Sequence, residues 1–163
     1  MEDKAYDFDS KQYHLSRMIR KYETELMRLS FLYLHDYHLA QDAVQDTFMK
    51  AYMSYSGFRG DASERTWLTR IAINTCKNYA KRFWRQKVDL KDVWSELPQD
   101  GTSDDVTDDG MAESVMEAVM KLPLKYREII LLYYYQELKV KEISAVLGIP
   151  VSTVTNRLSR ARE

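Results

Sequence analysis

The chain has 163 residues and carries 24 lysines and arginines against 25 aspartates and glutamates. This length allows one ordinary domain or two small ones and excludes a large multidomain enzyme. One cysteine and three histidines exclude a disulfide framework and argue against a zinc site, so we expect no metal and no cofactor. The sequence has no apolar run of about 18 residues and no hydrophobic N-terminal stretch, which predicts a cytoplasmic protein without membrane insertion.

The charges are distributed unevenly along the chain. Residues 65–91 contain eight bases and one acid, whereas residues 92–117 contain nine acids and no base. Residues 118–163 again have an excess of bases, eight against four acids. The net charge of −1 is therefore the sum of unlike segments and does not exclude a nucleic-acid-binding protein. The alternative is that each charge run is an ordinary solvated face.

The first part of the chain has the periodicity of helices. Residues 11–56 contain no glycine or proline, and the polar stretch HDYH at 35–38 indicates a turn between two helices. Gly57 and Gly60 mark a loop. Asp61 or Ser63 is expected to cap a third helix, which we predict over residues 64–84.

A change of composition divides the chain. Residues 99–110 are polar and acidic with two glycines, which is typical of a linker, and helical patterning then continues to the end. No strand alternation and no repeat is present. We predict an all-α fold with an N-terminal helical domain (10–85), a flexible acidic linker (86–111) and a C-terminal helix-turn-helix domain (112–163).

The predicted helix at 64–84 has two distinct faces. An apolar stripe is expected to pack on the first two helices: Leu68, Ala72, Thr75, Tyr79 and Phe83. The other face carries an aromatic ring, amides and cations: Trp67, Asn74, Asn78, Lys81 and Arg85, flanked by Arg70 and Lys77. Such a face suits unstacked single-stranded DNA, and Phe58 and Arg59 in the preceding loop can wall a base pocket. The alternative places Trp67 in the core beside a solvated face.

Residues 138–163 have the pattern of a helix-turn-helix. Gly148 suits a left-handed turn, Pro150 stops the first helix, and Ser152 is expected to cap the second. Polar side chains then point away from the apolar stripe: Ser152, Thr155, Asn156, Ser159 and Arg160, with Arg157 at the edge. Short polar groups with Asn and Arg suit base edges in the major groove. The alternative is an ordinary helical hairpin with a basic face.

Other residues have simpler interpretations. The tyrosines at 133–135 are expected in the core of the second domain, and Cys76 is expected to be a small buried hydrophobe. The acid pairs Asp104/Asp105 and Asp108/Asp109 raise the alternative of a metal-dependent nuclease, but a glycine-bearing linker lacks the rigid scaffold that such a site needs.

Three stretches together resemble the extracytoplasmic-function (ECF) sigma factors of bacterial RNA polymerase. They are LAQDAVQDTFMKAY (39–52), FRGDASERTWLTRIAINTCKNYAKR (58–82) and LPLKYREIILLYYYQELKVKEISAVLGIPVSTVTNRLSRAR (122–162). The resemblance implies a non-enzymatic sigma subunit that directs core polymerase to promoters. Its implied partners are promoter DNA, an anti-sigma factor and core RNA polymerase, bound through the β′ clamp helices and the β flap. A free-standing helix-turn-helix regulator with an N-terminal dimerisation or sensing domain is the alternative.

The resemblance also assigns roles to residues. Those expected to contact polymerase are Asp42, Gln45, Asp46 and Phe48. Those expected to contact the −10 element are Phe58, Arg59, Trp67, Asn74, Lys77, Asn78 and Lys81. Those expected to contact the −35 element are Ser152, Thr153, Thr155, Asn156, Arg157, Ser159 and Arg160.

Overall fold

The computed structural model describes residues 2–88 and 110–163, and these residues form helices without any strand. The first half contains α1 (Glu2–Leu34), α2 (Tyr37–Ser54), the 3₁₀ turn η1 (Tyr55–Gly57) and α3 (Glu64–Val88). The second contains α4 (Gly110–Lys121), α5 (Leu124–Ile130), the π-helical turn η2 (Leu131–Tyr135), α6 (Val140–Leu147) and α7 (Val151–Arg162). The all-α prediction is confirmed. Most of the predicted linker, residues 89–109, lies outside the described residues.

Local chemistry sets the boundaries of the first three helices. The turn predicted at 35–38 is present but is limited to His35 and Asp36, because α2 already begins at Tyr37. His35 has a φ of 55°, and the Asp36 carboxylate accepts a 2.8 Å hydrogen bond from the Leu39 backbone N–H. At the start of α3 the cap is Ser63 rather than Asp61, because the Ser63 Oγ accepts from the Thr66 N–H at 3.1 Å. α3 runs past the predicted end at residue 84 to Val88, since no glycine or proline interrupts it.

The helix-turn-helix consists of α6 and α7. Gly148 has the predicted left-handed conformation, with a φ of 65°, and the Ser144 Oγ donates a 2.6 Å hydrogen bond to the Ile149 carbonyl. The prediction that Ser152 caps the second helix is wrong. Pro150 occupies the cap position and its carbonyl accepts from the Val154 N–H at 3.1 Å, so Ser152 lies within the first turn of α7.

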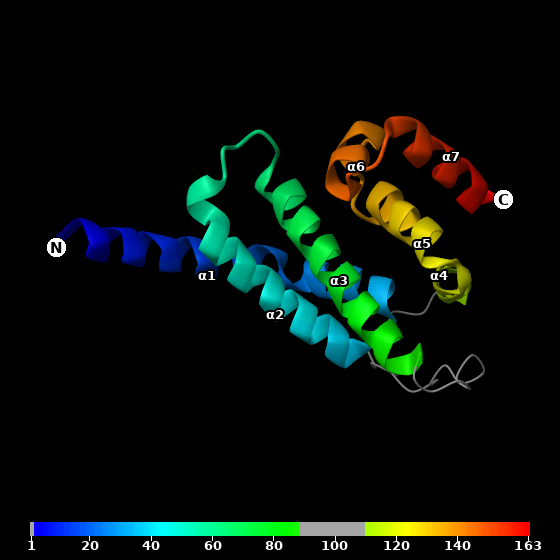
Figure 1. The fold of residues 1–163 in the computed structure, drawn as a ribbon, viewed down its shortest axis with the longest axis horizontal. Helices are drawn as coiled ribbons and strands as arrows, with labels where there is room; N and C mark the ends of the chain where they lie inside the picture. The colour runs from blue at the N-terminus through cyan, green and yellow to red at the C-terminus, as the bar shows by residue number, and fades with distance from the viewer. Residues whose placement is uncertain (1, 89–109) are drawn as a thin grey trace.

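The two halves pack against each other along α3. Figure 1 shows α5 and α6 beside α3, and α1 also contacts α5 and η2. Thr69 donates a 3.0 Å hydrogen bond to the Gln136 side-chain oxygen, and Arg65 donates to the Gln136 carbonyl at 2.9 Å. The half-buried Arg127 donates to the Tyr33 carbonyl at 3.1 Å, and burial lowers the pKa of its guanidinium. These polar contacts therefore accompany a single apolar core cluster that includes residues of both halves.

Burial differs from the predicted pattern at several positions. Leu68, Ala72 and Thr75 of the predicted stripe are buried, but Phe83 at its end is exposed. Tyr134 is also exposed, contrary to the expected tyrosine core, and its hydroxyl accepts a 2.9 Å hydrogen bond from Arg162. Cys76 is fully buried as predicted, and this burial raises the pKa of its thiol to about 11.

Candidate nucleic-acid interface

Aromatic rings cluster in front of the N-terminus of α3. The Phe58 and Trp67 ring centroids are 4.9 Å apart, and Trp67 meets Tyr55 edge-on at 6.2 Å. Tyr55 in turn stacks on His14 at 4.9 Å. Trp67 is half-buried and packs against the core, so only part of this cluster is open to solvent.

The outer face of α3 continues from this cluster. Asn74, Asn78 and Lys81 are exposed, as is Arg59 in the preceding loop. The face therefore presents two amides and cations beside the aromatic cluster, which is the combination that binds unstacked bases and their phosphates. The side chain of Arg85, predicted for the same face, lies outside the described side chains.

Lys77 differs from its neighbours because it contacts a buried carboxylate in the other half. The Glu128 side chain is 7% exposed and lies 3.4 Å from the Lys77 Nζ. It also lies 3.4 Å from the Arg157 Nη1 and accepts a 3.2 Å hydrogen bond from the Tyr33 hydroxyl. Burial, reinforced by the Glu128 charge, raises the pKa of Tyr33. One buried carboxylate thus pairs with one cation from α3 and one from α7, which leaves one positive charge in excess.

Residues on α7 form a second polar surface. Ser152, Thr155 and Asn156 are exposed. The remaining predicted −35 residues are Ser159 and Arg160, which are exposed, and Thr153 and Arg157, which are half-buried. The surface contains a shallow hollow of about 250 Å³. Its lining residues are Lys125, Tyr126, Thr153, Asn156, Arg157 and Arg160.

Two of these lining residues, Lys125 and Tyr126, belong to α5 and were missed by the sequence reasoning. A hydrogen bond with the Arg160 side chain lowers the pKa of Tyr126, so α5 and α7 act together on one side of the hollow. The adjacent Lys125 and Tyr126, two residues after Pro123, are the signal in the sequence, but only the fold brings them next to α7.

The four residues expected to contact polymerase lie on α2 in different environments. Asp42 and Gln45 are exposed. Asp46 is half-buried and accepts a 2.7 Å hydrogen bond from the Tyr79 hydroxyl, and burial with this bond raises the pKa of Tyr79 to about 12. Phe48 is 6% exposed and belongs to the core. Its side chain therefore supports α2 from beneath and is not available to a partner.

The described residues contain no cluster of three histidines, cysteines or acids that could hold a metal ion. Asp104, Asp105, Asp108 and Asp109, on which the nuclease alternative rests, lie outside the described residues. Within the described ranges, no helix is long and apolar enough to cross a membrane.

Comparison with known proteins identifies both halves. Residues 18–86 match the family described as sigma-70 region 2, and residues 112–163 match sigma-70 region 4. The RNA polymerase sigma-H factor of Pseudomonas aeruginosa is 34% identical over 157 residues, covering 90% of this chain and 81% of that protein. The ECF RNA polymerase sigma factor SigW of Bacillus subtilis is 32% identical over 152 residues, covering 87% and 81%.

Solved structures agree in fold. The sigma factor RpoE, in complex with the anti-sigma factor NepR from Bartonella quintana, has a TM-score of 0.75 at 23% identity and covers 90% of this chain and 91% of its own. CnrH, in complex with the cytosolic domain of CnrY, has a TM-score of 0.64 at 25% identity, with coverages of 93% and 84%.

A helix-turn-helix joined to a helical domain with an open aromatic and basic face defines a transcription factor that acts on DNA. The relatives make the class specific: the chain belongs to the ECF sigma factors of the sigma-70 family. It is a promoter-directing subunit of RNA polymerase, and a free-standing regulator is not favoured.

Proposed function

We propose that this sigma factor captures unstacked bases of the −10 element on α3 and reads the −35 element as duplex with α7. It has no catalytic activity of its own and acts in the cytoplasm. The observation that carries the proposal is the open face of α3, where the exposed Asn74, Asn78 and Lys81 continue from the Phe58–Trp67 cluster.

The energies involved are compatible with strand opening. Stacking a base on an aromatic side chain contributes about 1–3 kcal/mol. Removing a base from a duplex costs on the order of a few kcal/mol. The Phe58–Trp67 cluster, with hydrogen bonds from Asn74 and phosphate contacts from Arg59 and Lys81, therefore offsets the cost of holding a base outside the duplex.

The α7 surface is suited to the −35 element. Arg160 is exposed on the second half of α7 and lines the same hollow as Asn156. Arg160→Ala is expected to weaken binding to the preferred −35 sequence by about 1–3 kcal/mol, since a bidentate contact to guanine is lost. Selection from DNA with a randomised −35 region measures this effect. An unchanged sequence preference would show that Arg160 does not contact the −35 bases.

The exposed face of α2 is the proposed contact for the polymerase β′ clamp helices. Asp42 and Gln45 are accessible there, while Phe48 packs beneath them. Replacing both Asp42 and Gln45 by alanine is expected to reduce capture of core polymerase at least tenfold, because hot-spot contacts of this kind contribute about 1–2 kcal/mol or more each. Affinity capture of purified core polymerase measures the loss. The matched control replaces the exposed Glu23 and Gln12 of α1 and should leave capture intact.

An anti-sigma factor is the further proposed partner, because the related structures RpoE and CnrH are bound to NepR and CnrY, respectively. Such a partner is expected to cover the α3 and α7 surfaces until it is released. A protein that copurifies with the chain and blocks transcription by the reconstituted holoenzyme would identify it. For the second half of the chain, the proposed contact with core polymerase is the β flap.

A further inference from the structure

A row of polar contacts joins α2 to α3, and Figure 1 shows these two helices side by side. The Tyr79 hydroxyl of α3 donates a 2.7 Å hydrogen bond to Oδ2 of Asp46 on α2. One turn further along α2, the Lys50 ammonium donates to the Thr75 hydroxyl at 3.0 Å. Asp46 is one of the residues expected to contact polymerase, so this row connects α3 directly with the proposed contact.

The charge of the Asp46 carboxylate is not compensated within the described part of the chain. Lys50 is the cation one turn away on α2, but its ammonium group is engaged with Thr75. The Arg82 guanidinium lies 5.9 Å from the centroid of the Tyr79 ring. Among the residues that the structure describes, no lysine or arginine is within ion-pair distance of Asp46. A neutral phenol is therefore its partner in place of a cation.

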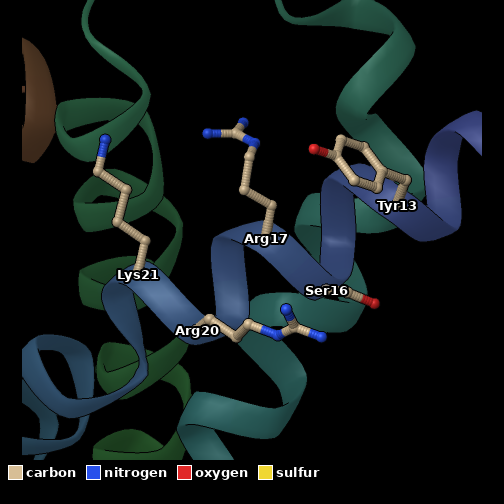
Figure 2. A pocket seen from close by; sticks show the side chains of 5 residues that line it. All are labelled: Tyr13, Ser16, Arg17, Arg20 and Lys21. Carbon is tan, nitrogen blue, oxygen red and sulfur yellow. The ribbon is translucent and has the colours of Figure 1, made fainter.

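The Glu64 carboxylate in the same half shows the contrasting arrangement. It lies 2.5 Å from Arg17, one of the basic side chains that project from α1 in Figure 2. That contact both orients the carboxylate and compensates its charge. The Tyr79 hydroxyl is an uncharged donor, so it orients Asp46 and leaves the negative charge available to another molecule. The exposed Asp42, one turn earlier on α2, adds a second negative charge to this face.

We infer that Tyr79 is a positioning residue of the polymerase contact: its hydroxyl holds Asp46 so that the second carboxylate oxygen, Oδ1, accepts a hydrogen bond from a lysine or arginine of core polymerase. A short hydrogen bond to an ionised acceptor fixes the carboxylate before binding. A side chain that is already ordered loses less conformational entropy when the partner arrives. The inference rests on the proposed contact between α2 and polymerase.

A purely structural role for the hydroxyl is the alternative. The Tyr79 ring is half-buried and packs against the core, so the bond to Asp46 could serve only to satisfy the hydroxyl. Burial, together with this bond, raises the pKa of Tyr79 to about 12, so the hydroxyl keeps its proton and remains a donor at neutral pH. The two roles differ in what the loss of the hydroxyl does once the Asp46 carboxylate is absent.

The test measures the affinity of core RNA polymerase for the full chain in the absence of DNA. Tyr79→Phe keeps the ring and removes the donor, and it is expected to weaken binding about fivefold, which corresponds to the loss of one ordinary hydrogen bond. Asp46→Ala is expected to weaken binding about tenfold. Because the hydroxyl acts through the carboxylate, adding Tyr79→Phe to Asp46→Ala should cause no further loss.

The matched control is Tyr55→Phe, which removes a hydroxyl 3.3 Å from His14 Nδ1 and should keep the wild-type affinity. Wild-type affinity for Tyr79→Phe would overturn the inference. An equal loss from Tyr79→Phe with and without the Asp46 carboxylate would also overturn it, because a purely structural role or partial unfolding produces that result. If Asp46→Ala bound polymerase as tightly as the wild type, the proposed contact at Asp46 would itself have failed, and the inference with it.

Discussion

Replacing Glu128 by glutamine is expected to lower the free energy of unfolding by about 3 kcal/mol. The carboxylate accepts a hydrogen bond from Tyr33 and lies 3.4 Å from cations on both α3 and α7. Glutamine keeps the volume but leaves Lys77 and Arg157 half-buried without a counter-charge. We take the lower end of the range for broken buried ion pairs because these two side chains are 28% and 29% exposed and solvent screens part of the interaction.

Urea unfolding followed by circular dichroism measures this loss as a lower midpoint. The matched control is Glu117→Gln, which removes an exposed carboxylate 3.9 Å from Lys121 and is expected to change stability by less than about 0.5 kcal/mol. Equal urea midpoints for the two variants would contradict the prediction that the Glu128 ion pairs stabilise the fold. The Glu128 carboxylate also bears on DNA binding, because DNA phosphates that approach Lys77 or Arg157 compete with it for these cations.

Asn74→Ala is expected to reduce open-complex formation about tenfold while leaving polymerase binding unchanged. The amide is exposed on the face of α3 that continues from the aromatic cluster, and losing its hydrogen bonds to a captured base removes about 1–1.5 kcal/mol. Permanganate reactivity of unpaired thymines measures opening, and affinity capture measures polymerase binding.

The matched control for this amide is Asn156→Ala on α7. Asn156 is also exposed, but in the proposed −35 surface. Its loss is expected to weaken promoter binding without a specific effect on opening once the complex has formed. If Asn74→Ala reduced polymerase binding and opening equally, the pocket assignment would be wrong.

The sequence predicted those features that depend on local chemistry and periodicity. The turn at 35–38, the left-handed Gly148 and the exposed amides of α3 follow from residue types and 3.6-residue spacing. The cap of α7 was mispredicted because Pro150 and Ser152 both suit a helix start, and the fixed φ of proline decided in favour of Pro150.

The packing between the halves could not be predicted from the sequence. Thr69, Ile73 and Lys77 follow one another on successive turns of α3, but a polar-apolar-polar row of this kind does not indicate a second buried face. Thr69 contacts Gln136 and Lys77 contacts Glu128, both far away in the sequence. The contribution of α5 to the α7 hollow was missed for the same reason, since it depends on tertiary contact alone.

The most direct test of the sigma-factor account is run-off transcription by core RNA polymerase on a pool of genomic DNA, with the start sites sequenced. With the full chain added, we expect transcripts from a limited set of start sites that share an upstream pair of elements near −10 and −35. Core polymerase alone should not produce them, and Asn74→Ala should reduce them. Transcripts that start at the same sites with or without the chain would contradict the account.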